Sequence, residues 1–210
     1  MANPGVQLLG FTLAFIGFIG TIACTVMVEW KASSYAGDNI ITAQAMYEGL
    51  WKSCVSQSTG QIQCKVYDSL LQLPANIQGT RGLMLASILL CFIAMMTAVV
   101  GMRCTTCMSE QPEQKDKLAL GGGVVIIIAG VLSLAGTSWY GHRIAQDFYN
   151  PFTPTNSRYE FGSALYLGWG AACLVLIGGG FLCCNCPNKS SGKSPRYPPS
   201  STGHPGRDYV

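Results

Sequence analysis

The segment at residues 82–102 reads GLMLASILLCFIAMMTAVVGM and carries no charged side chain. A helix needs about 20 apolar residues to cross a hydrocarbon core of roughly 30 Å. Backbone amides left unsatisfied in lipid are costly, so such a segment is expected to be helical. Three other segments have the same character, at residues 8–28, 118–141 and 161–184. The sequence therefore predicts four transmembrane helices, because buried helices of a soluble protein would carry polar faces.

The composition agrees with a membrane protein. The chain has 210 residues, of which 49% are hydrophobic and 11% charged, whereas soluble domains carry about 25% charged residues. The first apolar segment is longer than the core of a signal peptide, which spans about 7–15 residues, and residues 1–7 contain no Lys or Arg. We therefore expect this segment to be retained as the first span.

Basic residues are denser in two of the segments outside the spans, residues 103–117 and 185–210. By the positive-inside rule these segments and the N-terminus face the cytoplasm. The N-glycosylation sequon at Asn188 then lies inside the cell, and a glycan on it would contradict this topology. The expected order is a cytoplasmic N-terminus (1–7), the first span (8–28), a first outer loop (29–81), the second span (82–102), a cytoplasmic loop (103–117), the third span (118–141), a second outer loop (142–160), the fourth span (161–184) and a disordered cytoplasmic tail (185–210).

The first outer loop is long enough to hold structure of its own. Residues 29–35, 46–55 and 61–67 favour strands, and residues 58–60 are typical of a hairpin connection. Cys54 and Cys64 lie one on each arm of this hairpin, where a disulfide would stabilise it by about 2–3 kcal/mol. The alternative is two free thiols on the cell surface.

Residues 67–73 have apolar residues at helical spacing and precede Pro74, which suits the first turn of a helix. We expect a short surface helix there, leading into the second span. The expected fold class is membrane α+β: a four-transmembrane-helix bundle with a small extracellular antiparallel β-sheet formed by the two outer loops.

The four spans contain no Asp, Glu, Lys, Arg or His, whereas transporters and proton pumps usually need ionisable groups inside the membrane. Any pore is therefore expected in the outer loops. In the second outer loop, Phe148 and Tyr149 lie beside Asn150 and Pro151. These aromatic residues form either a belt at the membrane interface or a contact patch for another molecule.

Trp30, Gly49-Leu50-Trp51, Cys54 and Cys64 resemble the claudin signature, in which nine residues separate the two cysteines. The signature alone is shared with peripheral myelin proteins and calcium-channel gamma subunits. Further similarity favours the claudins and covers essentially the whole chain, at residues 1–3, 34–40, 42–47, 139–141, 159–162 and 209–210. One departure is Val28-Glu29, where many claudins have Pro-Gln, and it adds a negative charge at the membrane edge.

The resemblance implies a structural protein in the plasma membrane at epithelial tight junctions. Such a protein polymerises in cis and adheres in trans, and its paracellular strands act as a barrier or a charge-selective channel. Cys54–Cys64 would be the fold-defining disulfide. Leu70 would dock on Phe148 and Tyr149 of a neighbour, and Glu160 would belong to the same assembly surface. The implied partners are copies of this chain, other claudins, PDZ scaffolds of the zonula occludens type and, at residues 150–154, a clostridial enterotoxin.

The charges of the first outer loop balance, so no net field favours either sign of ion. The candidates for paracellular selectivity are Lys65, Asp38, Glu48, Lys52 and Asp68. The resemblance places the family's selectivity position at Lys65, just after the second cysteine. We expect Lys65 to repel cations, with a solvated surface charge as the alternative.

The cytoplasmic tail is rich in Ser, Pro, Gly and Lys, which cannot bury a core. It ends in Asp208-Tyr209-Val210, and a free C-terminal valine suits PDZ domains. Five cysteines follow the ends of spans, at Cys104, Cys107, Cys183, Cys184 and Cys186. They predict S-palmitoylation and membrane-lipid contact; the alternatives are unmodified thiols, or a metal or redox site.

Two other classes of function compete with the junction protein. An accessory subunit of a channel or receptor, like the gamma subunits, would co-purify with a channel and form no strands. A four-span thiol oxidoreductase would place its Cys-x-x-Cys near a quinone, but residues 104–107 face the cytoplasm and the spans offer no evident quinone site. The chain has no nucleophile–base pair and no phosphate loop. We expect no enzyme activity, no cofactor, no metal and no nucleic-acid partner.

Overall fold

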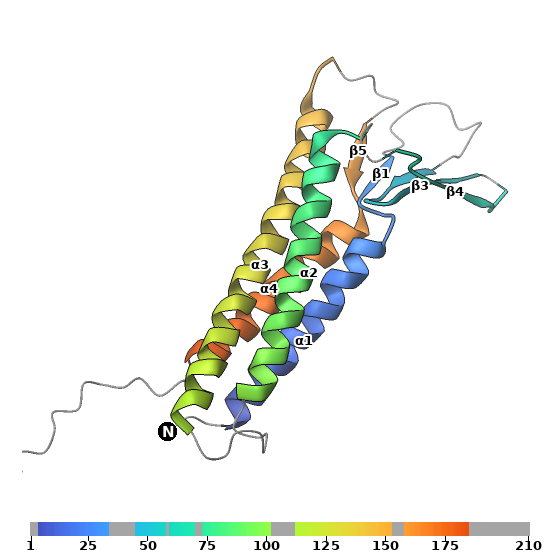
Figure 1. Cartoon of the computed structure of the whole chain (residues 1–210). Coiled ribbons are helices and arrows are strands. Elements are labelled where there is room, and N and C mark those ends of the chain that lie inside the picture. Colours follow the sequence, from blue (N-terminus) through green and yellow to red (C-terminus); the bar gives the residue numbers. More distant parts are fainter. Residues whose placement is uncertain are drawn as a thin grey trace, which may run out of the picture.

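The computed structural model describes residues 4–33, 45–57, 59–69, 73–101, 112–152 and 158–184. Four helices in this part form an antiparallel bundle: α1 (Pro4–Val26), α2 (Ala75–Gly101), α3 (Pro112–Tyr149) and α4 (Ser163–Cys184). Each is long and apolar enough to cross a membrane, which confirms the prediction of four spans. Figure 1 shows the β-sheet at one end of the bundle, opposite the end where α1 begins and α4 ends. Several predicted sites lie outside the described residues: Asp38, Leu70, Cys104, Cys107, Cys186, Asp208, Tyr209 and Val210.

Helix α2 begins at Ala75, well before the predicted span starts at residue 82. The carbonyl oxygen of Pro74 accepts the backbone N–H of Ile77 (3.0 Å) and of Gln78 (3.4 Å), so Pro74 stands at the helix start as its chemistry predicts. The separate surface helix predicted at residues 67–73 does not appear in its described residues, 67–69 and 73. Residues 70–72 lie outside the described part.

Helix α3 does not end at residue 141 but continues to Tyr149, so the first part of the predicted second outer loop is helical. Its inner face stays buried there, with Tyr140 2% and Ile144 5% exposed. A Cβ on Gly141 would come within 3.2 Å of Leu165. The helix outlasts its apolar run because this face still packs against α4 and the sheet. The membrane limits at residues 118 and 141 stay predictions.

The described strands form one antiparallel sheet in the order β4-β3-β2-β1-β5. Four strands come from the first outer loop: β1 (Lys31–Ser33), β2 (Ala45–Glu48), β3 (Lys52–Ser56) and β4 (Ile62–Val66). The fifth strand, β5 (Tyr159–Phe161), comes from the second outer loop and pairs with β1, placing Ala32 opposite Glu160. A sheet built from both outer loops is therefore confirmed.

The prediction of one continuous strand at residues 46–55 is wrong. The chain turns between Glu48 and Lys52, and β2 and β3 pair with each other on either side of this turn. Leu50 is fully buried at the turn and belongs to the core cluster under the sheet. The strand is interrupted because Leu50 packs into this core. Strand propensity depends on the local sequence and does not reveal such a tertiary contact.

Small residues and short hydroxyl contacts hold the spans together. A Cβ on Gly178 of α4 would lie 2.5 Å from the backbone nitrogen of Ala14 and 2.6 Å from the carbonyl oxygen of Gly10, both on α1. Between α2 and α3, the Ser87 hydroxyl donates to the Ala129 carbonyl oxygen at 2.7 Å. Close approach of backbones is the main source of packing energy between helices in lipid.

Gly178→Ala is expected to destabilise the bundle although alanine is the better helix former. The new methyl group would clash with backbone atoms of α1, which cannot move away as a side chain could. The overpacking costs about 1–3 kcal/mol, which outweighs the gain in helix propensity. Gly180→Ala is the matched control, because a Cβ at Gly180 meets nothing within 4 Å. The measurement is the thermal unfolding midpoint of each purified variant in detergent. A midpoint for Gly178→Ala at or above that of Gly180→Ala would contradict this packing.

Candidate functional site: the outer sheet and its anchors

Trp30 attaches the start of the sheet to the bundle. Its side chain is fully buried, and its indole N–H donates to the carbonyl oxygen of Cys24 at 2.9 Å. Its ring meets that of Tyr140 edge-on, with centroids 5.2 Å apart. A tryptophan supplies a large apolar surface and one donor, and both are used here.

The turn at Gly49 and Leu50 is the second anchor. The N–H of Gly49 donates to the carbonyl oxygen of Lys52 at 3.0 Å, which closes the turn. A Cβ on Gly49 would lie 2.7 Å from the Cα of Val28, so only glycine fits against this backbone. Leu50 can then enter the core under the sheet, which gives the Gly and the Leu of the signature triplet a physical role.

Arg81 is an anchor that the sequence analysis did not identify. Its side chain is 6% exposed, and its Nε donates to the Leu50 carbonyl oxygen at 2.6 Å. Its guanidinium lies 4.9 Å from the ring centroid of Trp51 and 5.6 Å from that of Tyr67. The flat cation thus joins α2 to the signature turn and to the segment after β4. Its position at the edge of an apolar segment was the one signal in the sequence.

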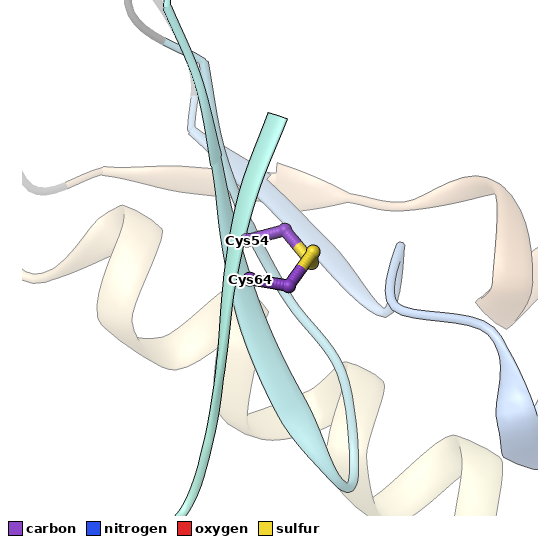
Figure 2. Close-up of a disulfide and its surroundings, with 2 residues drawn as sticks. All are labelled: Cys54 and Cys64. Carbon is purple, nitrogen blue, oxygen red and sulfur yellow. A yellow bond between two sulfur atoms is a disulfide. The ribbon is translucent and has the colours of Figure 1, made fainter. Parts of the chain in front are cut away.

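Cys54 and Cys64 form the predicted disulfide. They lie directly opposite each other on β3 and β4, with their Cα atoms 4.1 Å apart, and Figure 2 shows the bond on one side of this strand pair. The hairpin ends at Gly60, whose φ of 79° suits glycine and whose N–H donates to the Gln57 carbonyl oxygen at 2.9 Å. The disulfide, rather than two free thiols, is confirmed.

The Lys31–Glu48 ion pair of the first outer loop contacts Tyr159 of the second, which ties the two loops together. The Lys31 Nζ lies 2.6 Å from the Glu48 Oε2, and both side chains are about three-quarters buried. The same ammonium lies 4.4 Å from the ring centroid of Tyr159. Burial, with the Glu48 charge, raises the pKa of Tyr159, so its hydroxyl stays protonated and hydrogen-bonds to Glu48. Glu48 is thus engaged inside the sheet and is not a free charge on its surface.

Lys65 lies on β4, the edge strand, whose five residues are all exposed. Its Nζ is 2.8 Å from the Oδ2 of Asp68, and the two side chains are 76% and 78% exposed. The hydrogen bond to Asp68 and its charge raise the pKa of Lys65, so this lysine keeps its proton at physiological pH. Lys52, on β3, is partly buried.

Apart from Leu70, which lies outside the described residues, the residues predicted for assembly lie together beside β5. Phe148, Tyr149 and Glu160 all line one cavity of about 300 Å³ between the end of α3 and β5. Tyr149 is 82% exposed, Phe148 is half-buried, and the Arg158 guanidinium lies 5.8 Å from the Phe148 ring centroid. The two aromatics end a helix rather than lying in a loop, and this position is what aims them at the cavity.

Glu29, the departure from the claudin pattern, stands at the start of α4. Its carboxylate accepts a hydrogen bond from the Ser163 hydroxyl, and its backbone carbonyl oxygen accepts the N–H of Ala164 at 3.0 Å. An acidic side chain is favourable near a helix N-terminus. The added charge therefore has a partner within the chain.

At the end of the bundle away from the sheet, Cys183 and Cys184 are the last two residues of α4, and Cys184 is exposed. The other three predicted acylation sites lie outside the described residues. Palmitoylation of this cluster stays a prediction.

Four membrane-spanning helices and an outer sheet, clamped by a disulfide and fixed to the bundle by Trp30, Leu50 and Arg81, define a tetraspan membrane protein that presents a folded surface outside the membrane. The model of the PMP-22/EMP/MP20/Claudin family matches residues 4–182. Claudin-1 of Rattus norvegicus is 55% identical over 211 residues, and Claudin-7 of Homo sapiens is 51% identical over 214 residues; both matches cover 100% of each chain. Claudin-19 of Mus musculus is 53% identical over 194 residues, covering 92% of this chain and 87% of the relative.

The chain belongs to the PMP-22/EMP/MP20/Claudin family, and the relatives just named place it among the claudins. It is a multi-pass membrane protein of the tight junction. The claudins are structural junction proteins and are not known as enzymes.

Proposed function

We propose that this protein polymerises in cis with itself and other claudins, adheres in trans, and forms paracellular strands that restrict the passage of cations. The single observation that carries the proposal is Lys65, a protonated lysine on an exposed edge strand that the disulfide holds in place. A pathway between cells is bounded by outer surfaces, so a charge on this strand faces passing ions.

A single lysine has enough electrostatic energy to affect permeation. Two unit charges about 4 Å apart interact by roughly 1 kcal/mol in bulk water and about 4 kcal/mol at an effective dielectric constant of 20. Because about 1.4 kcal/mol corresponds to a tenfold change, a constriction needs little desolvation for Lys65 to matter. Asp68, 2.8 Å away, offsets part of the field, so the proposed exclusion of cations is moderate.

Lys65→Asp is expected to raise the sodium-to-chloride permeability ratio of a cell layer by several-fold, approaching about tenfold if the path is narrow. Asp68→Asn should lower the ratio, because it removes the charge that offsets Lys65. The control is Lys65→Arg, which keeps the charge and should leave the ratio near the wild-type value. The ratio is measured from dilution potentials at equal surface expression. An unchanged ratio in Lys65→Asp would show that Lys65 is a solvated surface charge.

For assembly within one membrane, we propose that Leu70 of a neighbouring copy docks at the cavity lined by Phe148, Tyr149 and Glu160. What supports this is the shape and chemistry of the cavity, which is aromatic, about 300 Å³ in volume and open beside an exposed Tyr149. An apolar side chain entering it would bury these rings. Exposed aromatic side chains around a pocket are typical of protein–protein contacts.

For the cytoplasmic side, we propose that Asp208-Tyr209-Val210 binds PDZ scaffolds of the zonula occludens type by adding a strand to the domain's sheet edge. Deleting Tyr209 and Val210 should abolish capture by an immobilised PDZ domain, and retained capture would refute the proposal. Enterotoxin binding at residues 150–154 stays a prediction from the resemblance. Within that segment, Phe152 is 93% exposed and its N–H donates to the Asn150 side chain.

A further inference from the structure

A second and larger cavity, of about 460 Å³, lies between the sheet, the first turn of α2 and the outer part of α3. Its volume falls within the range of small-ligand sites, about 300–1,000 Å³. Its helical walls, from Ala75 to Ile77 and from Tyr140 to Asp147, lie beyond or at the predicted outer ends of the second and third spans. Trp139, next to this wall, is 43% exposed, as expected for an aromatic at the membrane interface. With the predicted span limits, the cavity would lie at the level of the lipid headgroups.

Four charged side chains line the cavity: two form an ion pair with each other, and two have no partner among the described residues. Lys31 and Glu48 form an ion pair in the sheet wall. Arg143 and Asp147, one helical turn apart on α3, are both exposed and line the same cavity. Neither has a hydrogen bond or ion pair with any described residue. A free cation and a free anion so close together are complementary to a zwitterion.

The wall formed by α2 favours an anionic group. The helix has no acidic residue in its first turn. The backbone N–H groups of Ile77 and Gln78 donate to the Pro74 carbonyl oxygen, whereas those of Ala75 and Asn76, the first two of the helix, have no such acceptor. Free amide groups at the start of a long helix bind phosphate well, and Arg143 adds a planar donor set that matches phosphate oxygens. Inside the same cavity wall, the buried hydroxyl of Tyr140 has no hydrogen-bond partner in the described chain, and a ligand oxygen is one group that would satisfy it.

The remaining walls favour a cationic group. Asp147 supplies a free carboxylate, and the side chains of Tyr67 and Tyr159 line the cavity as well. Aromatic rings beside an acid recognise quaternary ammonium groups. The Lys31 ammonium lies 4.4 Å from the Tyr159 ring centroid, but Glu48 neutralises it at 2.6 Å. The free negative charge of this wall is therefore that of Asp147.

We propose that this cavity binds the phosphocholine headgroup of an outer-leaflet lipid, with the phosphate at Arg143 and the first turn of α2, and the trimethylammonium group at Asp147 and the tyrosines. Leu73, Ile77 and Ile144 also line the cavity and supply apolar contact for the glycerol end. The bound lipid would join α2, α3 and the sheet. This inference is independent of the paracellular role.

The test uses full-length protein in nanodiscs of phosphatidylglycerol with a small fraction of phosphatidylcholine, released into a maltoside detergent for native mass spectrometry of the retained lipid. The wild type is expected to retain phosphatidylcholine at several times its share of the bilayer. The Arg143→Gln/Asp147→Asn double variant should retain it in proportion to that share. His142→Gln is the control, because His142 is exposed on α3 beside Arg143 but does not line the cavity. Equal enrichment in the wild type and the double variant would overturn the proposal.

Competition experiments distinguish a lipid ligand from a soluble one, and a zwitterion site from a simple anion site. Free phosphocholine should displace the retained lipid, whereas glycerol phosphate at the same concentration should not. Displacement by both to the same extent would show an anion site only and would overturn the zwitterion. Binding of free phosphocholine without enrichment of the lipid would overturn the membrane source. Should the double variant fold poorly, Arg143→Gln alone and Arg143→Lys replace it, with loss expected in the first and partial retention in the second.

Discussion

Arg81→Met should abolish delivery of most of the protein to the cell surface and lower its unfolding midpoint more than any other single change considered. Arg81 donates to the carbonyl oxygen of Leu50 and lies against the rings of Trp51 and Tyr67. Methionine fills the volume but leaves that buried carbonyl without its donor. A charged hydrogen bond contributes about 1.5–3 kcal/mol and a desolvated cation–π contact about 2 kcal/mol. The expected loss is therefore about 3–5 kcal/mol.

Two further variants distinguish the loss of the specific Arg81 contacts from the loss of a positive charge in general. Arg81→Lys keeps the charge but loses the planar group and the Nε donor, so it should fall between Arg81→Met and the wild type. Lys117→Met, at an exposed lysine on α3 that does not line the larger cavity, should unfold near the wild-type midpoint. Thermal unfolding in detergent and surface biotinylation provide the two measurements. A wild-type midpoint for Arg81→Met would show that the signature turn does not depend on this arginine.

Replacing both disulfide cysteines, as Cys54→Ser/Cys64→Ser, is expected to give a protein that crosses the membrane but cannot seal. The bond closes a short loop and contributes about 2–3 kcal/mol to the β3–β4 hairpin. The spans pack through a separate core cluster, which includes Ala14, Cys91 and Ile126, so the bundle should persist. Released from β3, the edge strand carrying Lys65 would lose its fixed position.

Limited proteolysis from outside the cell measures this release. Cleavage between β3 and β4 should appear at least tenfold faster in the double variant than in the wild type. Cys173→Ala, an exposed free cysteine on α4, is the control and should be cleaved at the wild-type rate. Equal cleavage rates in all three proteins would mean that the sheet holds its shape without the bond.

The features that could be predicted from the sequence are those set by composition and by local chemistry. Four apolar segments of sufficient length require four helices in lipid, and two cysteines flanking a Gly-containing turn indicate a hairpin that can be cross-linked. Pro74 gives the start of α2 for the same local reason. None of these depends on what the rest of the chain contacts.

The features that were missed depend on tertiary contacts. The break at Gly49 and Leu50 follows from burial of Leu50 against the bundle, and α3 outlasts its apolar run because Ile144 packs inward. From its charge alone, Arg81 would be assigned to the exposed loop. In the structure it is buried against Leu50, Trp51 and Tyr67. The partners of Glu48 and Glu29 likewise lie on other strands or helices. A charge count cannot show that such residues are already paired.

The proposed assembly surface combines residues that the sequence identifies with an arrangement that only tertiary contacts determine. Phe148 and Tyr149 were identified by resemblance and by their aromatic character, but as loop residues. As the last residues of α3 they have a fixed direction, and β5 brings Glu160 to the same cavity. The pairing of β5 with β1 spans more than a hundred residues of sequence between Ala32 and Glu160, and no local pattern specifies it.

The measurement that tests the central claim most directly is made in epithelial cells that lack endogenous claudins. Transepithelial resistance and the sodium-to-chloride permeability ratio are recorded after the protein has reached the cell surface. We expect resistance to rise and sodium permeability to fall relative to chloride, since the strands restrict passage and Lys65 repels cations. No change in either quantity, at verified surface delivery, would contradict a paracellular barrier and would favour an accessory subunit of a channel or receptor.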